Sequence, residues 1–195
     1  MAIQPSANAP RSVVIVGGGF SGALFGLKLH RARPNWRIAI VEPKKRIGRG
    51  IAYGACDPEH LLNVPVSRME IGLVPGFAEW LTPRKQDIAA ALVESGSDLP
   101  SAYVPRQLFG DYIEERVGEA LSAKARTGLT SIRGEAVRLL DGARGVLLTD
   151  GREIKADIVV LAMGNLPPRP PGGPDRWLYD TGFFIPDPWA RDAFD

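Results

Sequence analysis

The sequence predicts an α/β fold built on a parallel sheet, and three observations lead to this prediction. A short apolar run of β-branched residues, Val13 to Val16, is followed by a glycine-rich turn and a helical pattern. A second apolar run ends at Glu42, so strand, helix and strand occupy about thirty residues, the size of one βαβ unit. A third apolar run, 157–164, closes the patterned part of the chain. Strands buried on both faces of a parallel sheet are apolar in this way.

The first βαβ unit has clear boundaries in the sequence. A helix is expected from Ser21 to about Arg33. Pro34 ends it, because proline disfavours the helical conformation in the residue before it. The second strand then runs from Trp36 to Glu42.

A long loop and inserted helices follow this unit. The stretch 43–73 is rich in glycine, proline and basic residues without a sustained period, so we expect an ordered loop, and loops of this length are usually functional. A short helical turn is expected at 77–81, and a helix over 83–95 with Thr82 as its N-cap. A longer helix begins at Pro105. Its predicted apolar stripe consists of Leu108, Tyr112, Ile113, Val117, Ala120 and Leu121. Its outer face, expected to be solvated, carries Asp111, Glu114, Glu115, Arg116 and Glu119.

The pattern changes to short strands after Gly128. Asp-Gly pairs at 141–142 and 150–151 separate alternating runs, which is typical of hairpin turns. The apolar run 157–164 then follows as a buried strand. We expect residues 11–166 to form one domain, after a disordered lead at 1–10 and before a proline-rich connection at 167–195.

Composition excludes several classes of protein. The 195 residues carry 24 Lys and Arg against 22 Asp and Glu, a net charge of +2, which gives no basis for binding nucleic acid or a membrane. Cys56 is the single cysteine, so no internal disulfide can form and a reducing, cytoplasmic location is expected. With two histidines and no cysteine pair, a zinc site is not expected.

The glycine-rich turn has the spacing of a dinucleotide-binding fingerprint. Gly17, Gly19 and Gly22 match G-x-G-x-x-G between a strand and a helix. The first glycine permits the tight turn, the second lets a diphosphate approach the backbone, and the third lets the helix pack on the strand. Phe20 and Ser21 lie within the turn, where the helix directs its free N–H groups at an anion and the serine hydroxyl can assist.

An acidic residue completes this fingerprint. Glu42 ends the second strand twenty residues after Gly22. A carboxylate at this place accepts hydrogen bonds from the ribose diol and repels a 2′-phosphate. The sequence therefore predicts a Rossmann-like domain that binds a dinucleotide, either NAD or FAD.

The stretch after Glu42, "EPKKRIGRGIAYG", resembles the two-dinucleotide-binding flavoproteins, in which a glycine pair with a flanking arginine wraps the FAD diphosphate. The matching residues here are Gly48, Arg49 and Gly50. The runs over 134–164 are similar to the β-meander and returning strand of that family. The resemblance implies that Val137 bonds the adenine through its backbone, and that Met163 and Gly164 form the family's turn after the last strand. FAD is therefore expected rather than NAD.

A narrower resemblance covers about 11–189. The stretches "PEHLLNVPVSRM", "YVPRQLFGDYI" and "VVLAMGNLPP" are similar to a bacterial group of FAD/NAD(P)-binding proteins that includes flavin-dependent hydroxylases, some of them amino-acid N-hydroxylating. This resemblance implies that Asn63 and Val64 lie near the diphosphate or flavin, with Arg106 nearby. Asn63 can equally brace the loop, and Arg106 can equally be a surface residue, without any contact to a cofactor. His60, in the same loop, is a candidate general acid or base, or a loop cap.

Two functions remain open from the sequence. The first is an FAD-dependent oxidoreductase of the monooxygenase type, which uses NAD(P)H to hydroxylate a small-molecule substrate. Because a second nucleotide fingerprint is missing, this chain would be its FAD-binding region, incomplete and inactive alone. The second is a non-enzymatic module that binds NAD or FAD as a sensor or scaffold.

Overall fold

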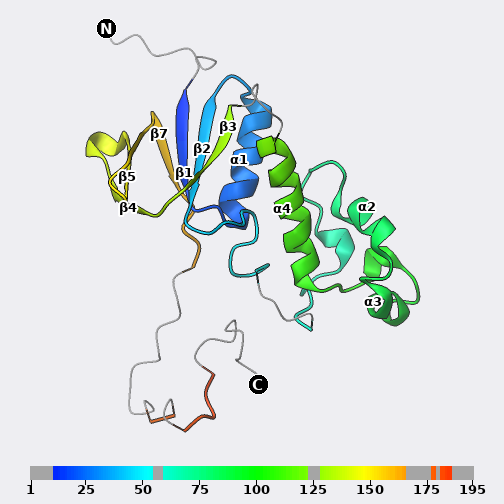
Figure 1. Cartoon of the computed structure of the whole chain (residues 1–195). Helices are drawn as coiled ribbons and strands as arrows, with labels where there is room; N and C mark the ends of the chain where they lie inside the picture. The colour runs from blue at the N-terminus through cyan, green and yellow to red at the C-terminus, as the bar shows by residue number, and fades with distance from the viewer. Residues whose placement is uncertain (1–10, 55–58, 123–127, 166–176, 179–180, 186–195) are drawn as a thin grey trace.

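The structure is a computed structural model that describes residues 11–54, 59–122, 128–165, 177–178 and 181–185 (Figure 1). The expected lead at 1–10 and the cysteine at position 56 lie outside the described residues. Most of the expected connection over 167–195 lies outside them as well.

A four-stranded parallel sheet forms the centre of the fold, as the sequence predicts. Its strands are β1 (Ser12–Val16), β2 (Arg37–Glu42), β3 (Leu129–Arg133) and β7 (Ile158–Leu161), in the spatial order β3-β2-β1-β7. Every neighbouring pair is parallel. All four strands therefore end at the same edge of the sheet, the lower edge in Figure 1.

The two faces of this sheet are covered differently. Helices α1 (Phe20–Ala32) and α4 (Arg106–Ser122) pack on one face (Figure 1). The antiparallel meander of β4 (Ala136–Leu139), β5 (Gly145–Leu148) and β6 (Glu153–Lys155) packs on the other. Alternation along β1 serves both faces, because Val13 and Ile15 face the helices while Val14 and Val16 face the meander.

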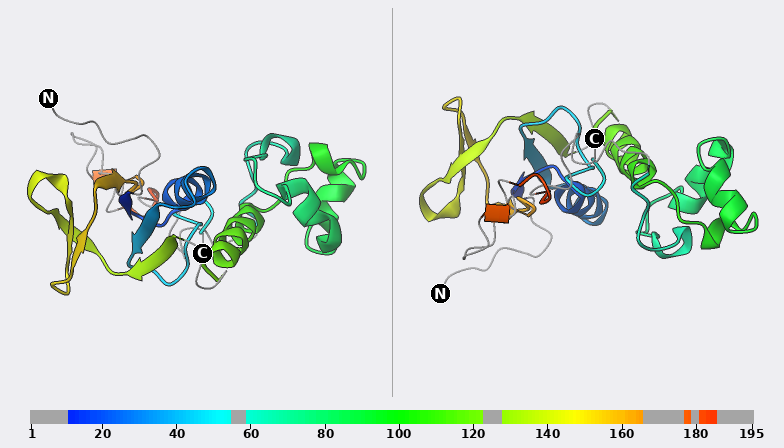
Figure 2. Two further views of the ribbon diagram at one scale, coloured as in Figure 1. Left: turned by 90° about the horizontal axis from the view of Figure 1, so that it is seen from above. Right: turned by 90° about the horizontal axis from the view of Figure 1, so that it is seen from below.

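A small helical lobe stands on the far side of α4, away from the sheet (Figure 2). It contains α2 (Phe77–Leu81), α3 (Ala89–Glu94) and three short turns, η1 (Val66–Arg68), η2 (Thr82–Arg84) and η3 (Leu99–Ser101). Aromatic rings attach it to α4. Phe77 meets Phe109 edge-on at 4.9 Å between centroids, and the Tyr112 hydroxyl donates to the carbonyl oxygen of Pro75 at 2.8 Å.

The predicted helix over 83–95 is wrong in its first half. The chain forms η2 over Thr82–Arg84 and begins α3 only at Ala89. The Thr82 hydroxyl donates to the carbonyl oxygen of Ala78 at 3.1 Å, so this side chain closes α2 and does not cap a new helix.

The strands after Gly128 are correct in place and shorter than predicted. The run from Leu129 divides at Gly134 into β3 of the parallel sheet and β4 of the meander, and the last run divides between β6 and β7. Both Asp-Gly turns join meander strands, as predicted. Among the described residues, no helix combines the length and apolar character needed to span a bilayer.

The expected solvated face of α4 is wrong for Arg116, whereas Glu115 is exposed as predicted and Glu114 is half-buried. Arg116 is only 9% exposed and pairs with Glu119 at 2.8 Å. Glu114 bonds arginines of the 43–54 loop, and Glu115 accepts from the indole of Trp80 at 2.9 Å. The helix is therefore covered on two sides, by the sheet with α1 and by the loop with the lobe.

Candidate dinucleotide-binding site

The glycine turn connects β1 to α1 at the edge where the parallel strands end (Figure 1). Gly17 has φ +102°, a conformation that L side chains rarely adopt, and its N–H donates to the carbonyl oxygen of Val41 at 2.9 Å. A Cβ on Gly17 would overlap the carbonyl oxygen of Ala162, just after β7. A Cβ on Gly22 would overlap the carbonyl oxygen of Gly17. The turn is thus packed between the end of β7 and α1, with no space for a side chain at position 17 or 22.

Helix α1 begins directly at this turn with its N-terminus open. Gly19 precedes it in an extended conformation, and among the described side chains none caps the helix there. Phe20 and Ser21 are its first residues, and its first turn carries no acidic side chain. The unpaired N–H groups and the positive end of the helix dipole therefore point at the edge of the sheet, an arrangement that favours an anion.

The Glu42 carboxylate is fixed beside the glycine turn. One oxygen accepts from the backbone N–H of Gly18 at 2.7 Å, and the other accepts from the N–H of Lys44 at 3.0 Å. The Glu42 carbonyl oxygen also accepts from the N–H of Gly134 at 3.2 Å, which connects β2 to the start of the meander. The sequence-predicted acid and the predicted turn are thus in direct contact.

The second glycine loop lies against the first. The N–H of Gly48 donates to the carbonyl oxygen of Gly18 at 2.7 Å. A Cβ on Gly19 would stand 3.3 Å from the Cα of Gly50, so a larger side chain there would fill the space between the loops. The Arg49 side chain bonds Asp111 and Glu114 of α4.

The stretch that carries Asn63 and Val64 is joined to the start of α4. The Arg106 guanidinium donates to the carbonyl oxygen of Leu61 at 2.8 and 3.1 Å, and the Arg106 N–H donates to the carbonyl oxygen of His60 at 2.8 Å. Asn63 is exposed and Val64 is half-buried. The structure thus joins Arg106 to His60 and Leu61, next to Asn63 in the chain.

Tyr53 is a neighbour of this site that sequence reasoning missed. Its ring lies edge-on to Phe20, with 5.3 Å between centroids, and 4.9 Å from the ring of Phe109. Burial raises the pKa of the Tyr53 hydroxyl, and the positive charge of Arg106 partly offsets this increase. Tyr53 therefore connects the first residue of α1 with the start of α4. The aromatic residue in "GIAYG" was the available signal.

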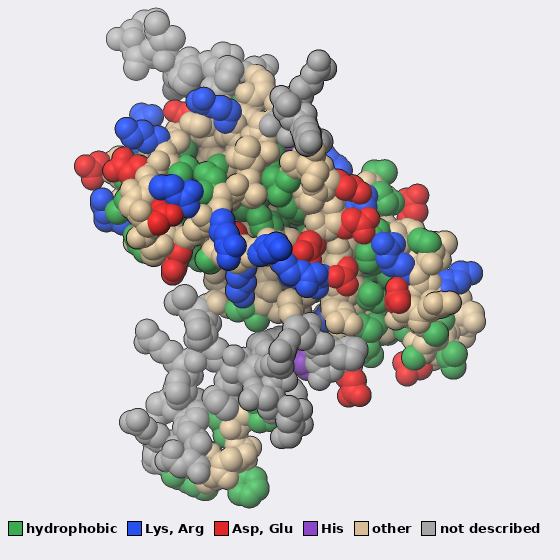
Figure 3. All heavy atoms as spheres, viewed as in Figure 1, with side chains coloured by type: hydrophobic (Ala, Val, Ile, Leu, Met, Phe, Trp, Pro, Cys, Tyr) green, Lys and Arg blue, Asp and Glu red, His purple; other side chains and the backbone are tan. Residues whose placement is uncertain are grey.

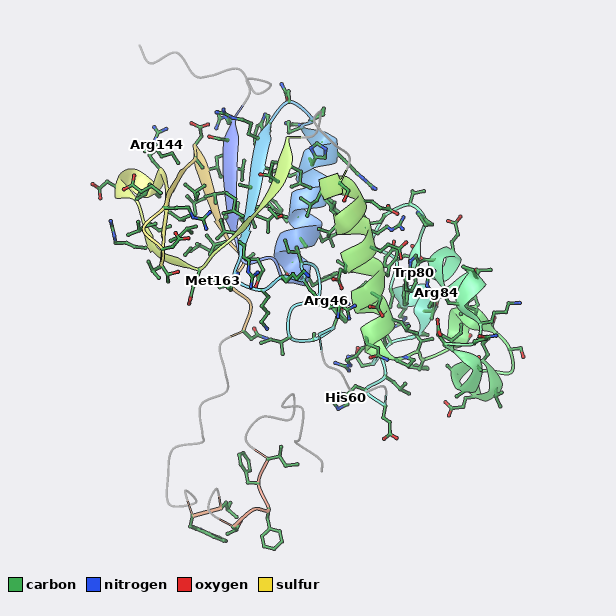
Figure 4. The ribbon with its side chains drawn as sticks, viewed as in Figure 1. Arg46, His60, Trp80, Arg84, Arg144 and Met163 are labelled. Carbon is green, nitrogen blue, oxygen red and sulfur yellow. The ribbon has the colours of Figure 1, made fainter. Side chains whose placement is uncertain are left out.

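The remaining predicted residues flank the turn. Val137 is 56% exposed and lies at a β-bulge between β4 and β5, where the register shifts between Ala136 and Arg138. A bulge leaves its extra residue outside the strand ladder. Met163 and Gly164 follow β7, and Met163 projects below the sheet (Figure 4).

Positive charge gathers around this edge. Figure 3 shows Lys and Arg side chains clustered below the sheet and along the adjoining loop. The sequence of that loop contributes Lys44, Lys45, Arg46 and Arg49, of which the two arginines pair with carboxylates of α4. Such a cluster attracts anions. Among the described residues, no group of three or more His, Cys, Asp or Glu could hold a metal ion.

Two shallow cavities in the described part of the molecule lie elsewhere. One, of about 270 Å³, is lined by Leu27, His30 and Arg116 among others, and a second, of about 460 Å³, lies between the amino end of the sheet and β6. Neither is lined by the glycine turn.

An open helix N-terminus, a glycine turn and an acid at the end of the next strand define a dinucleotide-binding α/β domain. A comparison with protein families agrees. Residues 14–166 match the model of the family described as FAD-NAD(P)-binding, and the chain belongs to that family.

Known relatives include redox enzymes. The L-aspartate N-monooxygenase (nitrosuccinate-forming) of Streptomyces cremeus is 29% identical, in a match that covers 74% of this chain and 26% of the relative. This chain therefore spans about a quarter of the length of that relative.

Solved structures share the fold. A flavin-containing monooxygenase from Stenotrophomonas maltophilia has a TM-score of 0.51 at 19% identity, over 80% of this chain and 38% of that one. The tryptophan 5-halogenase MibH has a TM-score of 0.50 at 20% identity, over 84% and 41%.

Proposed function

We propose that this chain binds FAD through the ADP part of the cofactor, as the FAD-binding region of an NAD(P)H-dependent oxidoreductase of the monooxygenase type. One observation carries the proposal. The Glu42 carboxylate is bonded to the glycine turn, and the Gly50 loop meets the same turn from the other side. A ribose site and a diphosphate site are thereby adjacent and in the order that ADP requires.

The residues of the edge fit the charges and groups of this cofactor. In the proposal, the N–H groups at Gly19, Phe20 and Ser21 donate to the diphosphate, and the Ser21 hydroxyl can add a further bond. Gly17 and Gly22 keep the turn close to the strand and helix. The main chain at Gly50 closes the second side of the diphosphate.

The two ends of the cofactor are proposed to meet different parts of the chain. At the adenine end, the bulge at Val137 offers backbone groups outside the strand ladder. At the other end, Asn63, Val64 and Arg106 would supply amide groups and a positive charge. Met163 and Gly164 border the turn from β7. Flavin supplies the redox chemistry when bound, and these residues hold and orient it.

The hydroxylating type of reaction is supported by the relatives. The relative from Streptomyces cremeus is an N-monooxygenase, and the Stenotrophomonas maltophilia protein is a flavin-containing monooxygenase. We propose that the whole protein acts on a small molecule. The chain spans a quarter of the first of these relatives, so the substrate pocket and the NAD(P)H site are assigned to none of the residues described above.

Direct binding measurements test the cofactor. The purified chain should bind FAD in a one-to-one complex, detected by titration calorimetry and by quenching of flavin fluorescence. It should bind FMN much more weakly, because FMN lacks the ADP part. Gly19→Leu should abolish FAD binding, since the new side chain would occupy the space between Gly19 and Gly50. Gly118→Ala, on α4 in open space, is the matched control and should bind as the wild type does.

Other results would overturn the proposal. Tighter binding of NAD⁺ than of FAD would favour the nucleotide-sensing module, and FAD binding that survives Gly19→Leu would place the cofactor elsewhere.

A further inference from the structure

The loop that carries Arg46, Arg49 and Gly50 is enclosed between the glycine turn and helix α4. On the turn side, Gly48 donates to Gly18 and Gly50 lies against Gly19. On the helix side, a Cβ on Gly110 would overlap the carbonyl oxygen of Tyr53. The position of this loop against the turn therefore depends on its attachment to α4.

Two carboxylates of α4 make that attachment. Glu114 accepts from the Nε of Arg49 at 2.6 Å and from the Nε of Arg46 at 2.8 Å. Asp111 bonds Arg49 as well, and its carboxylate stands 3.6 Å from Arg46. Residues three apart lie on the same side of a helix, so both carboxylates face the loop.

The two arginines of this loop differ in how far their side chains are exposed to solvent. The Arg49 side chain is 11% exposed, and the carboxylates occupy two of its nitrogens, Nε and Nη2. The Arg46 side chain is 61% exposed at the surface of the same cluster. Because its guanidinium faces α4, Arg49 contributes to the glycine turn chiefly through the backbone that it holds.

We infer that Asp111 and Glu114 are positioning residues for the diphosphate loop, and that Arg49 acts through them and not as a diphosphate ligand. The inference rests on the proposed FAD site. Removing either carboxylate breaks part of the attachment to α4, so the Gly50 backbone is held less firmly beside Gly19. FAD then loses one side of its diphosphate site while the glycine turn itself remains.

A double-mutant cycle on FAD affinity tests this inference. Glu114→Gln and Arg49→Gln should each raise the Kd for FAD about tenfold, and the double variant should be no worse than either single variant, because both break the same attachment. Glu114→Asp, which keeps a carboxylate, should restore most of the affinity. Glu119→Gln is the matched control on the same helix, since Glu119 pairs with Arg116 and not with the loop.

Limited proteolysis gives a readout that is independent of FAD. At a temperature far below the thermal midpoint of each protein, trypsin should cleave after Lys44, Lys45, Arg46 or Arg49 faster in ligand-free Glu114→Gln than in the wild type and in Glu119→Gln.

The outcomes separate the two proposals. A multiplicative loss in the double variant would show that Arg49 touches the diphosphate, and unchanged affinity in Glu114→Gln beside a wild type that binds FAD would remove the positioning role. A wild-type chain that binds no FAD would overturn the proposed function itself, and the positioning role with it.

Discussion

At the scale of single residues, Gly22 shows why the fingerprint has the spacing it has. A side chain at this position would collide with the carbonyl oxygen of Gly17 and would stand 3.1 Å from the Cβ of Ala162. Neither the turn nor β7 can yield without disturbing the sheet. The third glycine is therefore required for packing, whatever the ligand.

A pair of glycine substitutions tests this steric explanation. Gly22→Ala should lower the free energy of unfolding by about 1–3 kcal/mol, the usual cost of overpacking. Gly118→Ala should raise it by about 0.5–1 kcal/mol, because position 118 lies inside α4 with open space around it. Urea unfolding followed by circular dichroism measures both. Equal effects of the same sign would contradict the explanation.

For other residues, burial and long-range partners could not be predicted from the sequence. Arg116 belongs to a run of charged residues that predicts a solvated face, yet it is only 9% exposed and pairs with Glu115 and Glu119. Glu114 finds its partner 65 residues away in the chain, at Arg49. Local charge patterns contain no information on such distant contacts, whereas the glycine turn is local and was predicted correctly.

At the scale of elements, α4 is covered by the sheet with α1 on one side and by the loop with the lobe on the other. The ionisation of Glu114 on this helix makes stability depend on pH. Burial tends to raise the pKa of Glu114, but hydrogen bonds from Arg46 and Arg49 outweigh burial and lower the pKa below its ordinary value of 4.5. A carboxyl whose pKa is lower in the folded state stabilises that state above its unfolded pKa. The contribution disappears as the pH falls through the folded pKa.

The expected result is a pH-dependent difference between two proteins. The free energy of unfolding of the wild type should fall between pH 5 and pH 3, and that of Glu114→Gln should fall less over about the same range. At pH 7 the wild type should be the more stable of the two. Urea titrations at fixed pH values provide the comparison, and parallel curves for the two proteins would show that Glu114 carries no such linkage.

Elements with a strong local pattern were predicted best. The βαβ unit, the long helix after Pro105 and both Asp-Gly hairpins follow from neighbouring residues alone. The predicted helix over 83–95 began too early because the Thr82 hydroxyl has two possible partners. It could accept from an N–H ahead of it as a helix cap, but it donates to the carbonyl oxygen of Ala78 behind it. The division of the strand at Gly134 likewise depends on which sheet each half joins.

At the scale of the whole molecule, one sheet joins two cores. The helix side contains Ile15, Ile40 and Phe109, and the meander side contains Val14 and Leu148. Neighbouring residues of β1 belong to opposite cores. Loss of packing on one side should therefore reduce the stability of the other.

Truncation of a meander residue tests this coupling. Leu148→Ala, at a side chain only 1% exposed, should cost about 2–5 kcal/mol. The helical circular dichroism signal should shift to the same lower denaturant midpoint as the overall unfolding, although the helices lie on the opposite face. Leu139→Ala, at a residue 42% exposed in the same meander, is the control and should change stability little. Separate transitions for helix and meander would contradict a single cooperative unit.

The two hydrogen bonds from the N–H groups of Gly18 and Lys44 to the Glu42 carboxylate have a consequence for nucleotide selectivity. Both oxygens are immobilised when the protein folds, so a sugar would meet an acceptor that has already lost its rotational freedom, and the entropy of that side chain would not oppose association. The same rigidity prevents the acid from swinging aside. A nucleotide with a phosphate on that sugar would face a stationary negative charge, and discrimination against it would be built in before any ligand arrives.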